Sequence, residues 1–138
     1  MIKQISYDDI RVGDSAIMNK RISVKDVESF AEILNDKDSF HVDEEVARKS
    51  IFGKRVCHGM HIASYISEVT GKELPGFGTI YLNQTLNFKT PVYLNSNITI
   101  EVKVLEKLPR RKLRMLTVIK DEDENLVLDG EAIVKVSK

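Results

Sequence analysis

Apolar and polar residues alternate with a period of two along most of the second half of the chain, and this pattern constrains the fold more than any other feature of the sequence. The connections between the last three runs are short, around Pro109-Arg110 and from Asp121 to Asn125, so they suit hairpins and exclude parallel crossovers. We therefore predict long antiparallel strands. Their alternating residues are Ile80, Leu82, Leu86 and Phe88; Ile98, Ile100, Val102 and Val104; Leu113, Met115, Thr117 and Ile119; Leu126, Leu128, Ala132, Val134 and Val136.

Helical patterns precede these strands. Ser23 and Asp26 have the spacing of a capping box, and apolar residues at helical spacing follow, which predicts a helix over about 24–34. After a polar break, Asp43 is placed to cap a short helix that continues through Lys49. The chain is therefore expected to form helices first and strands last.

The segment from about 58 to 70 carries apolar side chains around most of a helix circumference, which is typical of a buried helix. Gly71, followed by Pro75, is expected to end it. One buried helix and one long curved sheet predict an α+β architecture in which the sheet wraps around the helix.

Composition excludes several classes of protein. The 138 residues suffice for one domain, taken as 1–138, and 21 basic against 21 acidic residues leave no net charge to attract nucleic acid or a membrane surface. Cys57 is the only cysteine, which excludes an intramolecular disulfide framework and a multi-cysteine zinc site. Neither a secretion signal nor an apolar run long enough to cross a bilayer is recognisable. We expect a cytoplasmic protein.

Candidate chemistry is concentrated between residues 35 and 64. Asp36 and His41 lie in a predicted loop, where they can turn toward one point and hold a water between a carboxylate and an imidazole. Spacing alone favours a plainer interpretation, in which Asp36 caps a turn and His41 is an ordinary loop residue. Gly59 opens the buried helix, whose free N–H groups suit an oxyanion, although the glycine could equally serve only a tight entry into the helix.

The residues around this pair occur in a recognisable order. The loop reads Asn35-Asp36-Lys37-Asp38-Ser39-Phe40-His41, and the helix opens with His58-Gly59-Met60. Further matching residues are Asp43, Ala47, Phe52 and Val56, followed by the segments 74–82 and 86–92. This order, over nearly the whole chain, resembles the hydratase 2 signature of MaoC-like and (R)-specific enoyl-CoA hydratases of the short bacterial type.

The resemblance implies a hot-dog fold, a homodimer with the acyl pocket near its interface, and no metal or other cofactor. The implied reaction is the reversible syn hydration of a trans-2-enoyl thioester, of coenzyme A or acyl carrier protein, to the (R)-3-hydroxyacyl product. Asp36 and His41 would hold the water, the backbone N–H of Gly59 would bind the thioester oxygen, and Ser64 would line the site. An open sheet edge independently favours pairing of two copies.

Three residues depart from the family pattern. Asp38 and Ser39 stand where Asn and Pro are usual, so we expect a less rigid loop with an additional carboxylate. That carboxylate should raise the pKa of Asp36 and favour protonated His41. Asn35 replaces a common glycine, which it can mimic if the backbone there is left-handed.

Two other functions fit part of the pattern. A hot-dog thioesterase would hydrolyse the same thioester, but it gives no reason for Asp36 and His41 to accompany His58-Gly59-Met60. A non-catalytic acyl-CoA binding or sensing module would keep the pocket without turnover. A metal site on His58 and His61 is not favoured, because Gly59 already explains the helix start and the nearby carboxylate is ordinary.

Overall fold

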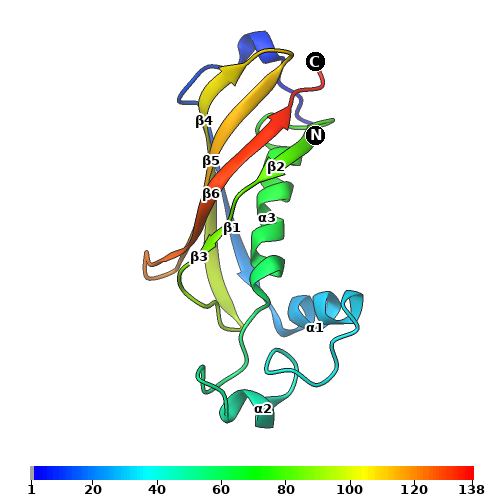
Figure 1. The fold of residues 1–138 in the computed structure, drawn as a ribbon, viewed down its shortest axis with the longest axis vertical. Coiled ribbons are helices and arrows are strands. Elements are labelled where there is room, and N and C mark those ends of the chain that lie inside the picture. The colour runs from blue at the N-terminus through cyan, green and yellow to red at the C-terminus, as the bar shows by residue number, and fades with distance from the viewer. Residues whose placement is uncertain (1) are drawn as a thin grey trace.

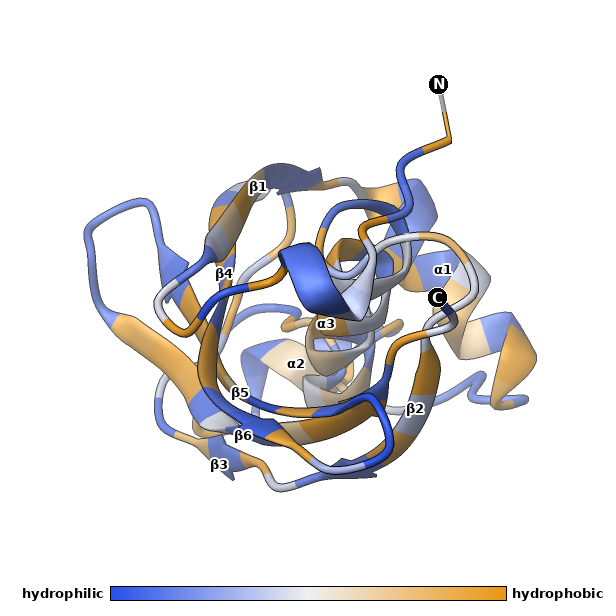
Figure 2. Ribbon diagram, turned by 90° about the horizontal axis from the view of Figure 1, so that it is seen from above, coloured by the Kyte–Doolittle hydropathy of each residue, from blue (hydrophilic) through white to orange (hydrophobic). Residues whose placement is uncertain are grey.

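A six-stranded antiparallel sheet curves around the helix α3 (Gly59–Lys72) in the computed structural model, which describes residues 2–138 (Figure 1). The strand order is β1-β4-β5-β6-β2, and β3 also pairs with β6. Seen from above, the sheet curls around α3 (Figure 2). The predicted α+β hot-dog arrangement is therefore confirmed. The strands are β1 (Ser15–Ile22), β2 (Ile80–Gln84), β3 (Asn87–Phe88), β4 (Ser96–Leu108), β5 (Lys112–Asp121) and β6 (Leu126–Lys135).

The core lies between the concave face of the sheet and α3. The predicted alternation holds in the three central strands, where every second side chain is buried. The helix contributes Ile62, Ile66 and Val69 to the same cluster. Burial of these side chains is the main stabilising contribution to a fold of this kind. The apolar residues of the edge strands β2 and β3 are about half exposed instead.

One prediction about the order of elements and one about the end of a helix are wrong. The strand β1 precedes the helices, so the chain does not form helices first. The outward residues of this edge strand are polar except for Ile17, and this exposed apolar residue makes the alternation hard to recognise in the sequence. Helix α3 continues through Gly71 and ends at Lys72, because a glycine weakens a helix without having to end it.

Two short helices and their loops form a projecting segment at one end of the sheet, close to the start of α3 (Figure 1). Helix α1 (Val24–Ile33) begins with the predicted capping box, in which Ser23 and Asp26 each accept a hydrogen bond from the other's backbone N–H. Helix α2 (Glu44–Arg48) is capped by Asp43 as predicted. None of the helices within residues 2–138 has the length and apolar character needed to span a membrane.

Candidate active site

The loop that carries Asp36 begins at the end of α1 with a left-handed residue. Asn35 has a φ of 54°, which confirms that asparagine takes the conformation usually given to glycine. The next backbone N–H, that of Asp36, donates to the carbonyl of Ala31 at 2.9 Å. The chain thus turns back on α1 before it continues to His41.

The Asp36 carboxylate accepts three hydrogen bonds. Its Oδ2 atom accepts from the Ser39 hydroxyl at 2.6 Å and from His58 Nε2 at 2.9 Å, and its Oδ1 atom accepts from the Ser39 N–H at 3.2 Å. The Ser39 hydroxyl, and next the His58 ring, lower the pKa of Asp36 to about 2, because each hydrogen bond favours the ionised form. The Asp36 side chain is still 16% exposed, so it can also accept a bond from water.

The expected effect of Asp38 on the pKa of Asp36 is wrong. Asp38 is exposed, and the hydrogen bonds from Ser39 and His58 outweigh any repulsion, so the pKa of Asp36 falls instead of rising. Ser39 makes hydrogen bonds within the loop that a proline could not make, and the expected lower rigidity stays a prediction. Its hydroxyl oxygen accepts from the His41 N–H at 3.1 Å and its carbonyl accepts from the N–H groups of Val42 and Asp43.

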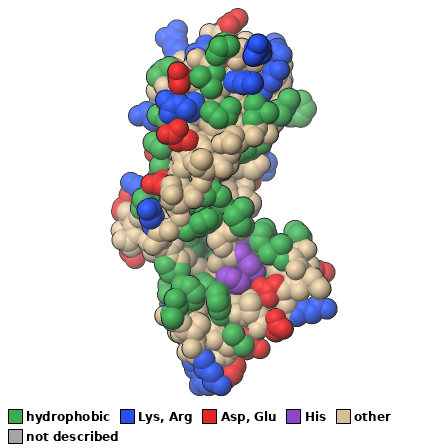
Figure 3. All heavy atoms as spheres, viewed as in Figure 1, with side chains coloured by type: hydrophobic (Ala, Val, Ile, Leu, Met, Phe, Trp, Pro, Cys, Tyr) green, Lys and Arg blue, Asp and Glu red, His purple; other side chains and the backbone are tan. Residues whose placement is uncertain are grey.

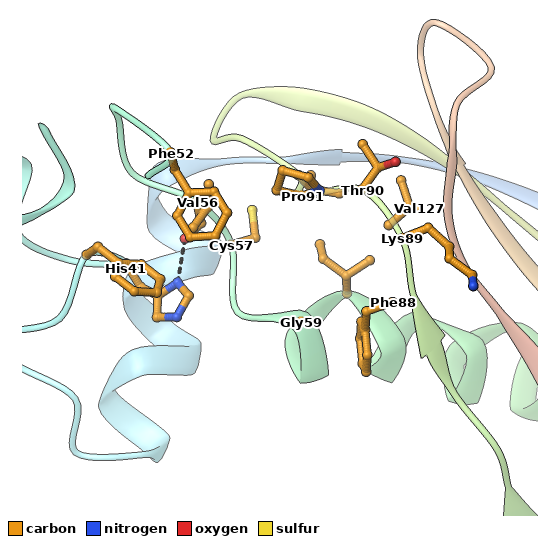
Figure 4. Close-up of a pocket in the computed structure, with 13 residues that line it drawn as sticks. His41, Phe52, Val56, Cys57, Gly59, Phe88, Lys89, Thr90, Pro91 and Val127 are labelled. Atoms are coloured by element: carbon orange, nitrogen blue, oxygen red, sulfur yellow. Dashed lines mark hydrogen bonds between the residues drawn. The ribbon is translucent and has the colours of Figure 1, made fainter. Parts of the chain in front are cut away.

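The His41 ring is fixed in one orientation by a backbone carbonyl. Its Nδ1 atom lies 2.7 Å from the Val56 oxygen, and because a carbonyl can only accept, Nδ1 carries the proton (Figure 4). In the neutral ring Nε2 is then a free acceptor. Burial lowers the pKa of His41 below its usual value, which favours this neutral form and contradicts the expectation of a protonated ring.

His58 is a site residue that the sequence analysis missed, since it considered this side chain only as a metal ligand. Its ring stacks on that of His41, with centroids 3.8 Å apart, while Nε2 binds Asp36. His58 therefore stands between the predicted acid–base partners, and Asp36 makes no direct hydrogen bond with His41 among the described residues. The only available signal was its place in the His58-Gly59-Met60 motif.

A cavity of about 380 Å³ connects His41 with the start of α3. His41 and Gly59 both line this space (Figure 4), and the space-filling view shows histidine atoms in a notch of the surface (Figure 3). Asp36 does not line this cavity but a second one of about 430 Å³, together with Glu28 and Glu32 of α1. The walls of the first cavity are mainly apolar: Phe40, Phe52, Val56, Cys57, Ile62, Phe88, Pro91, Val92 and Val127.

Gly59 provides an unoccupied donor at this cavity. Its N–H is the first of α3, no side chain caps the helix, and no hydrogen bond from it is present within residues 2–138. A Cβ at this position would lie 3.0 Å from Phe88 Cε1, so the ring of Phe88 packs closely because residue 59 is glycine. The free N–H and the partial positive charge of the helix start suit a carbonyl oxygen.

Three further residues of the region have other surroundings. Ser64 is exposed, donates to the His61 carbonyl at 2.5 Å and lines neither cavity, so its contact with substrate stays a prediction of the resemblance. His61 Nε2 lies 2.7 Å from the Tyr65 hydroxyl, whereas His58 Nε2 binds Asp36, so the Nε2 atoms of the two histidines have different partners. Cys57 is buried, and burial raises the pKa of its thiol to about 12, which fits a packing residue.

The arrangement as a whole has three parts. They are the neutral His41 imidazole with a free nitrogen, the ionised Asp36 carboxylate bonded to the neighbouring His58 ring, and the Gly59 N–H at the apolar cavity that His41 also lines. Such a site can remove a proton from a small molecule while it stabilises negative charge on an oxygen. A low-polarity wall strengthens both effects, since it excludes competing water.

Comparison with known proteins gives one consistent result. The sequence model of the family described as MaoC like domain matches residues 14–125. A 3-hydroxybutyryl-CoA dehydratase of Methylorubrum extorquens is 40% identical over 137 residues, which cover 99% of this chain and 87% of that protein. An (R)-specific enoyl-CoA hydratase of Aeromonas caviae is 35% identical, with 96% and 99% covered. The structure of the R-hydratase PhaJ1 from Pseudomonas aeruginosa superimposes with a TM-score of 0.93 at 37% identity, with 98% and 87% covered.

Proposed function

This chain belongs to the MaoC-like family, and on that basis we propose that it is an (R)-specific enoyl-CoA hydratase. As a hydro-lyase, it adds water reversibly to trans-2-enoyl-CoA and forms (R)-3-hydroxyacyl-CoA. One observation carries the proposal: His41, whose Nε2 is a free acceptor in the neutral ring, and Gly59, whose N–H is free, line the same apolar cavity. Addition of water to a polarised double bond forms a C–O and a C–H bond without net oxidation or reduction, so the reaction needs no redox cofactor.

The residues divide the work as follows in this proposal. His41 Nε2 takes a proton from water as the water oxygen bonds to C3, and the electrons of the double bond move onto the thioester oxygen. The Gly59 N–H stabilises this enolate oxygen, whose charge is larger in the transition state than in the substrate. Protonated His41 then returns a proton to C2 on the same face, which makes the addition syn.

Asp36 has a different role from His41 in this scheme. With a pKa of about 2, its carboxylate is ionised at neutral pH and is a weak base, so it acts as an acceptor for the second hydrogen of the water. For the two groups to orient one water before it attacks, that water must lie between the cavity lined by His41 and the cavity lined by Asp36. The proposal therefore makes His41 the base.

Coenzyme A is the proposed carrier of the acyl group. The relatives named for CoA thioesters are 40%, 38% and 35% identical to this chain. A mitochondrial 3-hydroxyacyl-[acyl-carrier-protein] dehydratase of Arabidopsis thaliana is 30% identical. Cys57 is the only cysteine, so folding of the chain needs no oxidising compartment, and we place the activity in the cytoplasm.

We further propose that two copies pair through the edge formed by β2 and β3. This edge presents Ile80, Leu82 and Phe88, and the first turn of α3 adds Met60; all four side chains are about half exposed. Such a group of apolar side chains beside an open strand suits a symmetric partner. Light scattering on the eluting protein should give about twice the chain mass of 15.7 kDa. A monomer at micromolar concentration would contradict the pairing.

The decisive experiment for the activity is product analysis with crotonyl-CoA. We expect the conjugated enoyl absorbance to disappear without release of free thiol, and chiral analysis to identify (R)-3-hydroxybutyryl-CoA. Release of thiol would identify a thioesterase instead. Binding of the substrate without either change would identify a non-catalytic acyl-CoA module and would end the proposal of hydration.

A further inference from the structure

Ser39 occupies a position between the two groups that act on the water. Its hydroxyl donates to Asp36 Oδ2 at 2.6 Å, and the same oxygen accepts from the His41 N–H at 3.1 Å. Its backbone N–H donates to Asp36 Oδ1 at 3.2 Å. One residue thus contacts both oxygens of the carboxylate and the backbone of the histidine.

We propose that Ser39 is a positioning residue that holds Asp36 and His41 at the separation needed to bind one water. The inference rests on the proposed hydration and deepens it. The Asp36 carboxylate has few other fixed partners, because His58 is the only other residue that donates to it within residues 2–138. His41 is fixed at its ring by Val56, but its backbone depends on Ser39 and on Arg55 Nε, which donates to its carbonyl.

The charges around Asp36 leave this task to Ser39 and His58. Glu28 and Glu32 of α1 line the same cavity but, as carboxylates, have no hydrogen-bond donor to offer, and Lys37 lies on the same cavity but donates no hydrogen bond to Asp36 among the described residues. Without the Ser39 hydroxyl, Oδ2 would keep only the His58 bond. The carboxylate could then rotate, and the water bound to it would lose its alignment with His41 Nε2.

The test compares Ser39→Ala and Ser39→Thr with a matched serine. Ser50 is the control. Its hydroxyl donates to the Ala47 carbonyl at 2.6 Å and accepts from the Phe52 N–H at 3.2 Å. This is the same pattern as at Ser39, but without a bond to Asp36 or His41. We expect Ser39→Ala to lower kcat for crotonyl-CoA about 10- to 100-fold with KM nearly unchanged. Ser39→Thr keeps the hydroxyl and should restore most of kcat, and Ser50→Ala should resemble the wild type.

A direct titration of Asp36 adds a readout other than kcat, and its wild-type part needs no variant. Carbon NMR of the Asp36 carboxyl in the wild type should show it ionised well below the usual value of about 3.9, and in Ser39→Ala its pKa should rise. Wild-type kcat in Ser39→Ala, a loss that Ser39→Thr does not restore, or an ordinary Asp36 titration in the wild type would each overturn the inference. Absence of hydration in the wild type would instead overturn the proposed function, so the two failures are distinguishable.

Discussion

Replacement of His41 by alanine should lower kcat for crotonyl-CoA hydration by about 10³- to 10⁴-fold, the upper part of the range for loss of a general base. KM should change little, because the apolar walls that hold the acyl group remain. The wild-type kcat/KM should fall as the pH decreases through the pKa of His41, because the protonated ring cannot accept from water. That pKa is lowered by burial, so the fall should be centred below 6.5. In His41→Ala it should be absent.

Two comparisons make this prediction specific. His61→Gln replaces another buried histidine, whose partner is Tyr65 and which lines neither cavity, and it should leave kcat close to the wild type. Asp36→Asn combined with His41→Ala should lose less than the product of the two single effects, because both groups act on the same water. Full activity of folded His41→Ala, checked by circular dichroism, would remove His41 from the reaction.

Replacement of Gly130 by alanine should lower the free energy of unfolding by about 3 kcal/mol, at the upper end of the usual range for overpacking. Gly130 lies in β6, where a Cβ would be 1.8 Å from the carbonyl oxygen of Thr85. That oxygen is backbone, and the adjacent residue Glu131 is bonded to Thr85 through both its N–H and its carbonyl. The contact therefore cannot be relieved without separating the β2–β3 connection from β6. Urea unfolding followed by circular dichroism measures the change.

Gly71 offers the matched control for this substitution. It lies inside α3, and a Cβ there would meet no atom within 4 Å. Gly71→Ala should therefore stabilise the protein by about 0.5 to 1 kcal/mol, because alanine is the better helix former. A loss below about 1 kcal/mol for Gly130→Ala would show that the connection moves more easily than the packing indicates.

Local signals in the sequence were sufficient for most of the fold. The capping residues Ser23 and Asp43 mark the starts of α1 and α2, and the strict alternation of β4, β5 and β6 marks a sheet with one buried face. The strand β1 has no such signal. It is an edge strand paired only with β4, and because Ile17 faces outward and Lys20 inward, its apolar and polar residues do not alternate regularly in the sequence.

The candidate site was predictable in its residues but not in its connections. Spacing and the resemblance indicated Asp36, His41 and Gly59, yet the Asp36–His58 bond joins residues 22 positions apart and depends on how the projecting segment folds against α3. The charge of Asp38 suggested a raised pKa for Asp36, because sequence proximity does not reveal which donors a carboxylate meets. The Ser39 hydroxyl, which reverses the sign, became evident only from three-dimensional geometry.

The stacked imidazoles of His41 and His58 have a consequence for the lifetime of the intermediate. The ring centroids are 3.8 Å apart. Burial is the main cause that lowers the pKa of His41; the adjacent His58 ring lowers it further, while the Val56 carbonyl and the Asp36 carboxylate act in the opposite direction. Because this pKa is lowered, the imidazolium formed in the proposed reaction is a stronger acid than a free one, and we expect it to give its proton readily to carbon. In the proposed reaction, the proton that enters C2 should therefore come chiefly from the water molecule that supplies the hydroxyl.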